Sequence, residues 1–225
     1  MRVRLIVFAF SLAAAAFASD GAGGYAGVPF HDSVYDGGPQ RIPGRIQCAY
    51  FDLGGEGVAY HTLDKRNQGS GALNAANGTY LNQFRMNEAV GTSYTKYHDA
   101  IDLNPFNTAQ PPEGELYVGW TTPGEWIKMT VRVEHAGTYS VDLLYTSNRG
   151  GTLSLDLEGA PLTPPIAIHS TSTAAEKIPW RQWHHWNEMR GIAEVKLPEG
   201  TSVLTLHILT EGNMNLAWLD FEPRG

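Results

Sequence analysis

Cysteine is nearly absent from this sequence, since Cys48 is the only one among 225 residues. A single cysteine cannot close an internal disulfide or build a cysteine-based zinc site, and none follows the N-terminal apolar run to carry a lipid anchor. The stability of the fold must therefore come from burial of apolar surface.

Long hydrophobic runs are also lacking after the first residues. Arg2 and Arg4 precede an apolar run that ends at Phe17, with a small residue at Ala18. This is the three-part form of a secretory signal, and the run is too short to span a bilayer. We expect residues 1–18 to be a signal peptide and the protein to be secreted, extracellular or periplasmic, with no membrane partner.

Charge is scarce, because Asp, Glu, Lys and Arg make up only 17% of the chain. The net charge is −7, and it becomes −9 if Arg2 and Arg4 leave with the signal. An acidic chain does not attract nucleic acid or anionic lipid. We therefore expect no nucleic-acid partner and favour a neutral one.

Helical periodicity is missing too, whereas short alternating segments are frequent. Apolar residues alternate with polar ones in six segments separated by glycine-rich turns, and the chain holds 25 glycines. The predicted strands are 126–133, 139–145, 153–157, 193–197, 204–208 and 214–222. Strands with one apolar face each need two sheets packed face to face, so the sequence predicts an all-β protein, a β-sandwich.

The predicted organisation has one domain. Residues 19–43 are rich in Gly, Asp and Pro without periodicity, which predicts a flexible leader. The β-sandwich is expected over residues 44–223. Residues 84–115 are polar and aperiodic, which predicts a long loop over one edge or end of the sandwich, and loops of that length tend to carry function.

Histidine and cysteine offer little catalytic chemistry in this pattern. His184 and His185 are adjacent, so they point in different directions and cannot both hold one zinc ion. The sequence has no G-x-S-x-G motif, and Cys48 lies among apolar residues, where a thiol usually packs as a small hydrophobe. We expect the histidines to pack beside tryptophan and no residue to be a nucleophile.

Carboxylates keep an enzyme open as an alternative. Eight acidic residues lie in or near predicted loops, among them Asp102 and Glu125. A glycosidase needs two carboxylates about 5–9.5 Å apart, which a sequence does not show. A small jelly-roll glycoside hydrolase or polysaccharide lyase is therefore the alternative to a binding protein.

Six tryptophans are more than a sandwich of this size needs for its core. Trp183 and Trp218 stand in apolar strand contexts and are expected to be buried. Trp120 and Trp180 flank turns, where an indole would be held at the surface. An exposed indole complements the C–H face of a sugar, while amide or carboxylate groups complement its hydroxyls. Contact with the core or with another protein is the competing interpretation.

Four stretches resemble, in this order, the family 6 carbohydrate-binding modules. They are "IPGRIQCAYFDLGGEGVAYH" at 42–61, "YVGWTTPGEWIKMTVRVEHAGTYSVDLLYTSNRGGTLSLDLEG" at 117–159, "PWRQWHHW" at 179–186 and "LPEGTSVLTLHILTEGNMNLAWLDF" at 197–221. The resemblance implies a galactose-binding-like jelly-roll sandwich that binds polysaccharide or oligosaccharide without cleaving it. It also implies action beside a glycoside hydrolase as a partner.

The resemblance implies particular site residues. Two aromatics of the family sandwich a sugar ring and match Trp120 and Trp180 here, while the family's asparagine matches Asn215. Trp183 is then left to the core. Tyr60 and Glu56, in the first long loop, are expected to contribute.

The resemblance also suggests a structural calcium ion, although we expect that no cofactor is required. Members of the family often hold the ion with two glutamates on the first strand and an acid near the end of the chain. Here Gln47 and Ala49 replace the glutamates, and Asp220 remains. One amide and one carboxylate are too few ligands for calcium.

The insertion at 84–115 is longer than in simple members of the family. This length predicts a cleft that is closed at one end and therefore favours the ends of sugar chains.

Overall fold

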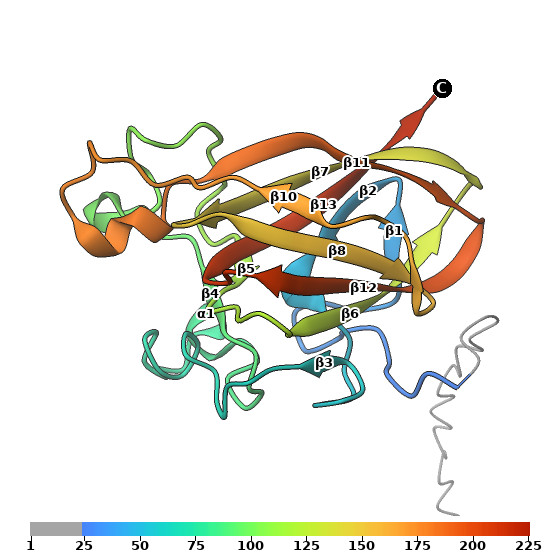
Figure 1. The fold of residues 1–225 in the computed structure, drawn as a ribbon. Coiled ribbons are helices and arrows are strands. Elements are labelled where there is room, and N and C mark those ends of the chain that lie inside the picture. The colour runs from blue at the N-terminus through green and yellow to red at the C-terminus, as the bar shows by residue number, and fades with distance from the viewer. Residues whose placement is uncertain (1–23) are drawn as a thin grey trace, which may run out of the picture.

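The computed structural model describes residues 24–225, so the predicted signal peptide lies outside the described residues. Two β-sheets packed face to face make up nearly all of the regular structure (Figure 1). The first sheet has the order β1-β6-β12-β8-β10, with β3 also paired to β6 and β9 to β8. Its strands are β1 (Gln40–Ile42), β3 (Tyr60–His61), β6 (Trp126–Val133), β8 (Gly151–Leu157), β9 (Ala160–Pro161), β10 (Ile166–Ile168) and β12 (Gly200–Thr210).

The second sheet has the order β11-β7-β13-β5-β4, with β2 also paired to β13. Its strands are β2 (Gly44–Gln47), β4 (Thr92–Tyr94), β5 (Leu116–Val118), β7 (Gly137–Ser147), β11 (Asn187–Leu197) and β13 (Met214–Arg224). Helical structure is limited to one short α-helix and three 3₁₀ turns, none long or apolar enough in the described chain to cross a membrane. They are α1 (Tyr80–Gln83), η1 (Cys48–Tyr50), η2 (His98–Ala100) and η3 (Pro179–Trp183).

The predicted β-sandwich is confirmed, and the alternation of the sequence explains it. In β6, Ile127, Met129, Val131 and Val133 are buried and face the other sheet, whereas Lys128 and Arg132 alternate with them. Antiparallel pairing of β12 with β6 places Leu204 opposite Met129 and Leu206 opposite Ile127. Successive side chains of a strand point to opposite faces, so these residues meet the second sheet in one core.

The second sheet is covered on part of its outer face as well. A small cluster of buried side chains lies there, formed by Tyr117, Leu144, Trp186, Ala217 and Trp218. Burial on both faces explains why β7 reads as a nearly continuous buried strand rather than an alternating one. The cluster also fixes the chain around Trp186 against the sandwich.

The prediction of a flexible leader over 19–43 is wrong for the residues that the structure describes. Residues 40–42 form β1, which pairs in parallel with 131–133 of β6. Val28 bridges to Leu53, and Phe30 is 4% exposed. This segment lacks a periodic signal because it packs through single aromatic side chains instead of an alternating strand face. The domain therefore begins before residue 44.

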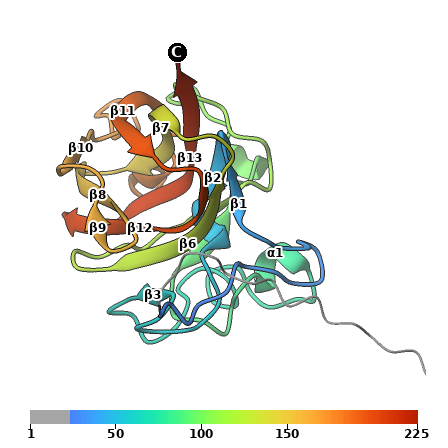
Figure 2. The same cartoon turned by 90° about the vertical axis from the view of Figure 1, so that its right-hand side faces the viewer.

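The long connections gather outside the two sheets. Figure 1 shows η3, in orange, beside the green segment near residue 105 at the left end of the sandwich, where strands of both sheets end. Figure 2 shows α1 and β3 with their loops beneath the sheets. The predicted 84–115 loop does lie over one end, although it also contains β4 and η2. Loops from distant parts of the chain are thus brought together on a rigid scaffold.

Phe30→Ala should lower the free energy of unfolding by about 3–5 kcal/mol, the usual cost of emptying a buried phenylalanine site. The ring contacts Tyr35, Tyr50 and Phe84, with centroids 5.2–5.9 Å apart. Chemical denaturation monitored by circular dichroism measures the change. Val34→Ala is the matched control, since Val34 is 66% exposed and stands in the same segment. Equal unfolding midpoints for the two variants would show that Phe30 does not anchor this segment, and would support a flexible leader.

Candidate functional site

A cleft of about 560 Å³ lies among the loops at this end of the sandwich. Trp120, Trp180 and Asn215, which are far apart in the sequence, all line it. They come from the loop after β5, from η3 and from the start of β13. The structure thus brings together the three residues that the resemblance placed in one site.

The backbone around Trp120 is adapted to hold its ring. Trp120 has φ +54°, a left-handed conformation that is strained for a bulky residue and is most often kept at functional positions. Its indole rests against the backbone at Gly69 and Gly91. A Cβ at Gly69 would lie 2.7 Å from Cζ3 of the ring, and one at Gly91 would lie 2.9 Å from Cε3. Glycine at both positions therefore lets the ring lie flush against the chain.

Trp180 is held by a compact turn yet remains 49% exposed. Pro179 begins η3, and Gln182 ties the turn to Thr173 with two hydrogen bonds of 2.9 and 2.8 Å. Arg181 lies 3.4 Å from the buried Glu176 carboxylate. The ring of Trp180 meets the ring of His184 edge to face, with centroids 5.8 Å apart. The indole is exposed because its supports hold the backbone and leave the ring in the cleft.

The prediction that Trp183 is buried in the core is wrong, because Trp183 lines the cleft. The core position belongs to Trp186, which is fully buried. A 3₁₀ turn at 179–183 replaces the strand periodicity that the prediction assumed. The predicted burial of Trp218 is confirmed.

Asn215 is positioned by Trp183. Its Nδ2 donates a 2.7 Å hydrogen bond to the Trp183 carbonyl, and its Oδ1 lies over Gly119. A Cβ at Gly119 would come within 2.6 Å of that oxygen, so the glycine makes room for the amide. Asn74 and Asn213 also line the cleft, and the sequence analysis missed both. Asn213 stands two residues before Asn215 in a turn, which was the available signal.

Asp102 supports the cleft from behind. Its carboxylate is fully buried, and Oδ1 accepts hydrogen bonds from Trp186 Nε1 at 2.6 Å and from His184 Nδ1 at 2.8 Å. Oδ2 accepts a bond from the backbone N–H of Lys96 at 2.7 Å. Nδ1 of His184 is therefore the donor to Asp102, which fixes the orientation of the ring at the cleft. His185 is buried, so one histidine lines the cleft and the other supports it.

The 84–115 segment forms one wall of the cleft with Ser93, Lys96, His98 and Ile101. None of these residues was singled out from the sequence, although the segment itself was expected to carry function. Burial lowers the pKa of Lys96, and the Asp102 charge opposes that effect. The ionisable groups that line the cleft include two histidines and a lysine but, in residues 24–225, no Asp or Glu.

Tyr60 and Glu56 are not part of this cleft. Tyr60 is 5% exposed and belongs to the main core, where its ring meets Phe51 edge to face. Glu56 pairs with His61 at 2.5 Å and accepts a bond from the Thr62 backbone. Both predictions are therefore wrong, because β3 turns Tyr60 inward and the Glu56 carboxylate closes its own loop.

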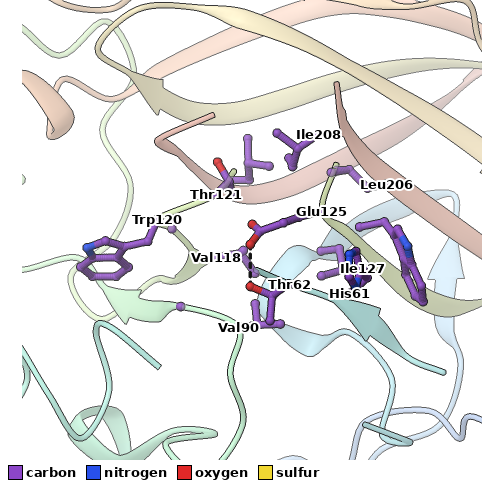
Figure 3. Close-up of a pocket in the computed structure, with 14 residues that line it drawn as sticks. His61, Thr62, Val90, Val118, Trp120, Thr121, Glu125, Ile127, Leu206 and Ile208 are labelled. Carbon is purple, nitrogen blue, oxygen red and sulfur yellow. Dashed lines mark hydrogen bonds between the residues drawn. The ribbon is translucent and has the colours of Figure 1, made fainter. Parts of the chain in front are cut away.

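A second, smaller cavity of about 20 Å³ lies on the other side of Trp120 (Figure 3). It is lined largely by core residues, and Glu125 is its main polar group. Figure 3 shows the Glu125 carboxylate bonded to the Thr62 hydroxyl. It also accepts bonds from the backbone of Leu63 and Thr122, at 2.9 and 2.8 Å. Glu125 thus ties two loops together, and the cavity is far too small for a sugar.

Gln47 and Asp220, the two residues that the resemblance suggested as calcium ligands, do not form a suitable site for the ion. Gln47 and Asp220 share the outer face of the second sheet, but Asp220 Oδ2 lies 3.2 Å from Arg45 Nε. The Arg45 guanidinium also stacks 4.2 Å over the Trp218 ring, so Asp220 already has its cation. Glu115 stands nearby with its pKa raised by burial. Calcium takes about 6–8 oxygens, and no group of three His, Cys, Asp or Glu in the described residues could hold a metal.

A β-sandwich with an aromatic, amide-lined cleft among its end loops is typical of a carbohydrate-binding module. The chain belongs to the family 6 carbohydrate-binding modules, whose family model matches residues 91–223. The match covers more than half of the chain and begins at Gly91, so the stretch at 42–61 lies outside it.

Several solved structures are similar to this chain at low sequence identity. A β-1,3-glucan binding family 6 module from Bacillus halodurans has a TM-score of 0.49 and 16% identity, covering 82% of this chain and 99% of its own. A family 6 module from Clostridium stercorarium in complex with cellobiose has a TM-score of 0.47 and 12% identity, covering 83% and 98%. A module from Cellvibrio mixtus lichenase 5A in complex with cellotriose has 0.44 and 20%, covering 60% and 88%. No curated protein matches the chain.

Removal of divalent ions should leave the stability of the protein unchanged. Arg45 supplies the positive charge beside Asp220, so we expect the fold not to need calcium there. Thermal melts before and after treatment with EDTA test this, and melts with added calcium or magnesium serve as controls. A melting temperature that falls in EDTA and recovers with calcium alone would contradict the role of Arg45.

Proposed function

We propose that the protein binds polysaccharide without cleaving it, and that the cleft stacks a sugar ring between Trp120 and Trp180. The observation that carries this proposal is that both indoles line one cleft although 59 residues separate them, as the numbering shows. The proposal includes secretion of the protein, as the N-terminal signal sequence predicts, and action beside a glycoside hydrolase, as the family resemblance implies. Residues 1–23 are outside the described structure, so secretion rests on the sequence alone.

Stacking on an indole suits a pyranose ring. The apolar C–H face of the sugar covers the ring, which removes apolar surface from water and adds contacts with the π-system. The ring of Trp120 packs against the backbone of Gly69 and Gly91, and the backbone of Trp180 is held in the η3 turn. Binding then orders few side chains, which lowers the entropic cost of association.

Hydrogen bonds would fix the orientation of the stacked ring. The amide of Asn215 is oriented by the Trp183 carbonyl, which leaves its Oδ1 to accept from a sugar hydroxyl. Asn213 offers a second amide, and His184 presents the ring edge opposite to Asp102. A few hydrogen bonds and stacking contacts on a preformed site give dissociation constants on the order of micromolar to millimolar.

The alternative of a glycosidase or lyase loses its candidate residues. Asp102 is fully buried and accepts three hydrogen bonds, and Glu125 holds two loops together. A glycosidase needs two carboxylates at the bond it cleaves, whereas the described lining of the cleft contains none. Chain-end preference remains a prediction, supported by His98 and Ile101 of the insertion in the cleft wall.

Trp180→Ala should weaken polysaccharide binding by about 2 kcal/mol, roughly thirty-fold in Kd, since truncation of a central aromatic anchor has that effect. The melting temperature should change little, because the ring is exposed and supports no core residue. Affinity electrophoresis in gels containing neutral or acidic polysaccharides measures the binding. Trp126→Ala is the matched control, since this tryptophan lies outside the cleft beside His61.

Other outcomes would reject the proposal in distinct ways. Equal retardation of the Trp180→Ala variant and the unmodified protein would remove the cleft from the function. Reducing ends or unsaturated products that accumulate with time would identify an enzyme. Absence of retardation with every polysaccharide would favour an adhesion or assembly module that uses the same tryptophans against another protein.

A further inference from the structure

The charge of the cleft is opposite to the charge of the chain. The protein carries a net charge of −7, yet among residues 24–225 the cleft lining contains three residues of basic type and no acid: Lys96, His98 and His184. The net charge of the chain by itself favours a neutral glycan. The local arrangement matters more, because a group in a cleft interacts mainly with charges within a few ångströms.

Lys96 is the most unusual of these groups. Its side chain is half-buried, and within residues 24–225 no carboxylate lies within ion-pair distance of Nζ. Nζ donates to the Tyr94 carbonyl over 3.4 Å and lies 4.2 Å from the centroid of the Tyr94 ring. An ammonium has three donors and loses hydration when buried. Lys96, which belongs to the cleft lining, therefore has further N–H donors that no protein group in residues 24–225 accepts.

Asp102 is the acid whose charge acts on Lys96, and its carboxylate is not part of the cleft lining. Its carboxylate is fully buried and does not line the cleft, and both of its oxygens already accept hydrogen bonds. The negative charge of Asp102 raises the pKa of Lys96, whereas burial of the lysine lowers it. Lys96 thus has the carbonyl and the ring of Tyr94 as neighbours, but no ion-pair partner among residues 24–225.

We propose that the cleft binds an acidic sugar unit, whose carboxylate or sulfate ester pairs with the ammonium group of Lys96 while its ring stacks on tryptophan. An anion at this point would satisfy the unused donors of Lys96, and the half-buried position limits screening by solvent. The cleft volume of about 560 Å³ has room for a pyranose with such a substituent. The inference rests on the proposed function and names the class of glycan that the same site takes.

Matched pairs of polysaccharides test this inference. Polygalacturonate and alginate are each compared with their carboxyl-reduced derivatives, and κ-carrageenan is compared with its desulfated derivative. The acidic member of at least one pair should bind about ten-fold more tightly in low salt, as expected for steered and partly desolvated ion pairing. The preference should shrink as salt is added. The pair that shows it distinguishes a carboxylate from a sulfate.

Variants assign the preference to Lys96. Lys96→Met should remove most of the preference for the acidic member, whereas Lys96→Arg should keep part of it. Lys196→Met makes the same change in net charge at an exposed position on β11 and should leave the preference unchanged. Thermal melts of all three variants verify folding. If Lys96→Met does not fold, the ratio within each pair and its salt dependence in the unmodified protein still decide.

The outcomes separate this inference from the proposed function. Equal or tighter binding of the neutral member in every pair, or an unchanged preference in Lys96→Met, overturns the acidic-sugar inference alone. In that case Trp180→Ala would still weaken binding. Failure of every polymer to bind overturns both proposals.

Discussion

The buried carboxylate of Asp102 is the interaction on which the cleft depends. It joins two segments, because within 84–115 it accepts a hydrogen bond from the Lys96 backbone, and it also accepts from Trp186 Nε1 and His184 Nδ1. A hydrogen bond to a charged group contributes about 1.5–3 kcal/mol, and a buried carboxylate without such partners would be strongly unfavourable. The Asp102 network therefore locks the 84–115 wall to the turn that carries Trp180. Trp186 transmits this attachment to the sandwich through the cluster with Leu144 and Trp218.

The β-sandwich provides rigidity, and the binding chemistry is confined to its end loops. The strands supply one core between two sheets, whereas glycines and a strained residue shape the cleft: Gly69 and Gly91 accept the indole of Trp120, and Gly119 accepts the amide of Asn215. Such close approaches are possible only without a Cβ. Preorganised rings and amides explain how a protein of this family could bind an extended sugar chain with few contacts, and a lysine at the wall adds selectivity to them.

The sequence predicted the sandwich well because alternation reports directly on one-sided burial, as in β6 and β12. It predicted Trp120, Trp180 and Asn215 as a set through family resemblance, since nothing in their spacing brings them together. It failed where single side chains decide the structure. Phe30 anchors a segment without periodicity, and Trp186 is buried instead of Trp183 because a 3₁₀ turn shifts the phase of burial. Tyr60 and Glu56 failed because loop position does not reveal which way a side chain points. Lys96 was missed because the net charge of a chain says nothing about the charge of one cleft.

The most direct test of the central claim is an NMR titration that follows the six indole N–H signals. The titrant is an oligosaccharide fragment of a polysaccharide that the protein binds. Each tryptophan reports on a different place: three line the cleft, Trp186 and Trp218 are buried beside the second sheet, and Trp126 lies outside the cleft. The account predicts that the signals of Trp120, Trp180 and Trp183 move on binding while the Trp126 signal stays in place. Movement of the Trp126 signal alone, with the three cleft signals unchanged, would show that sugars bind elsewhere and would contradict the account.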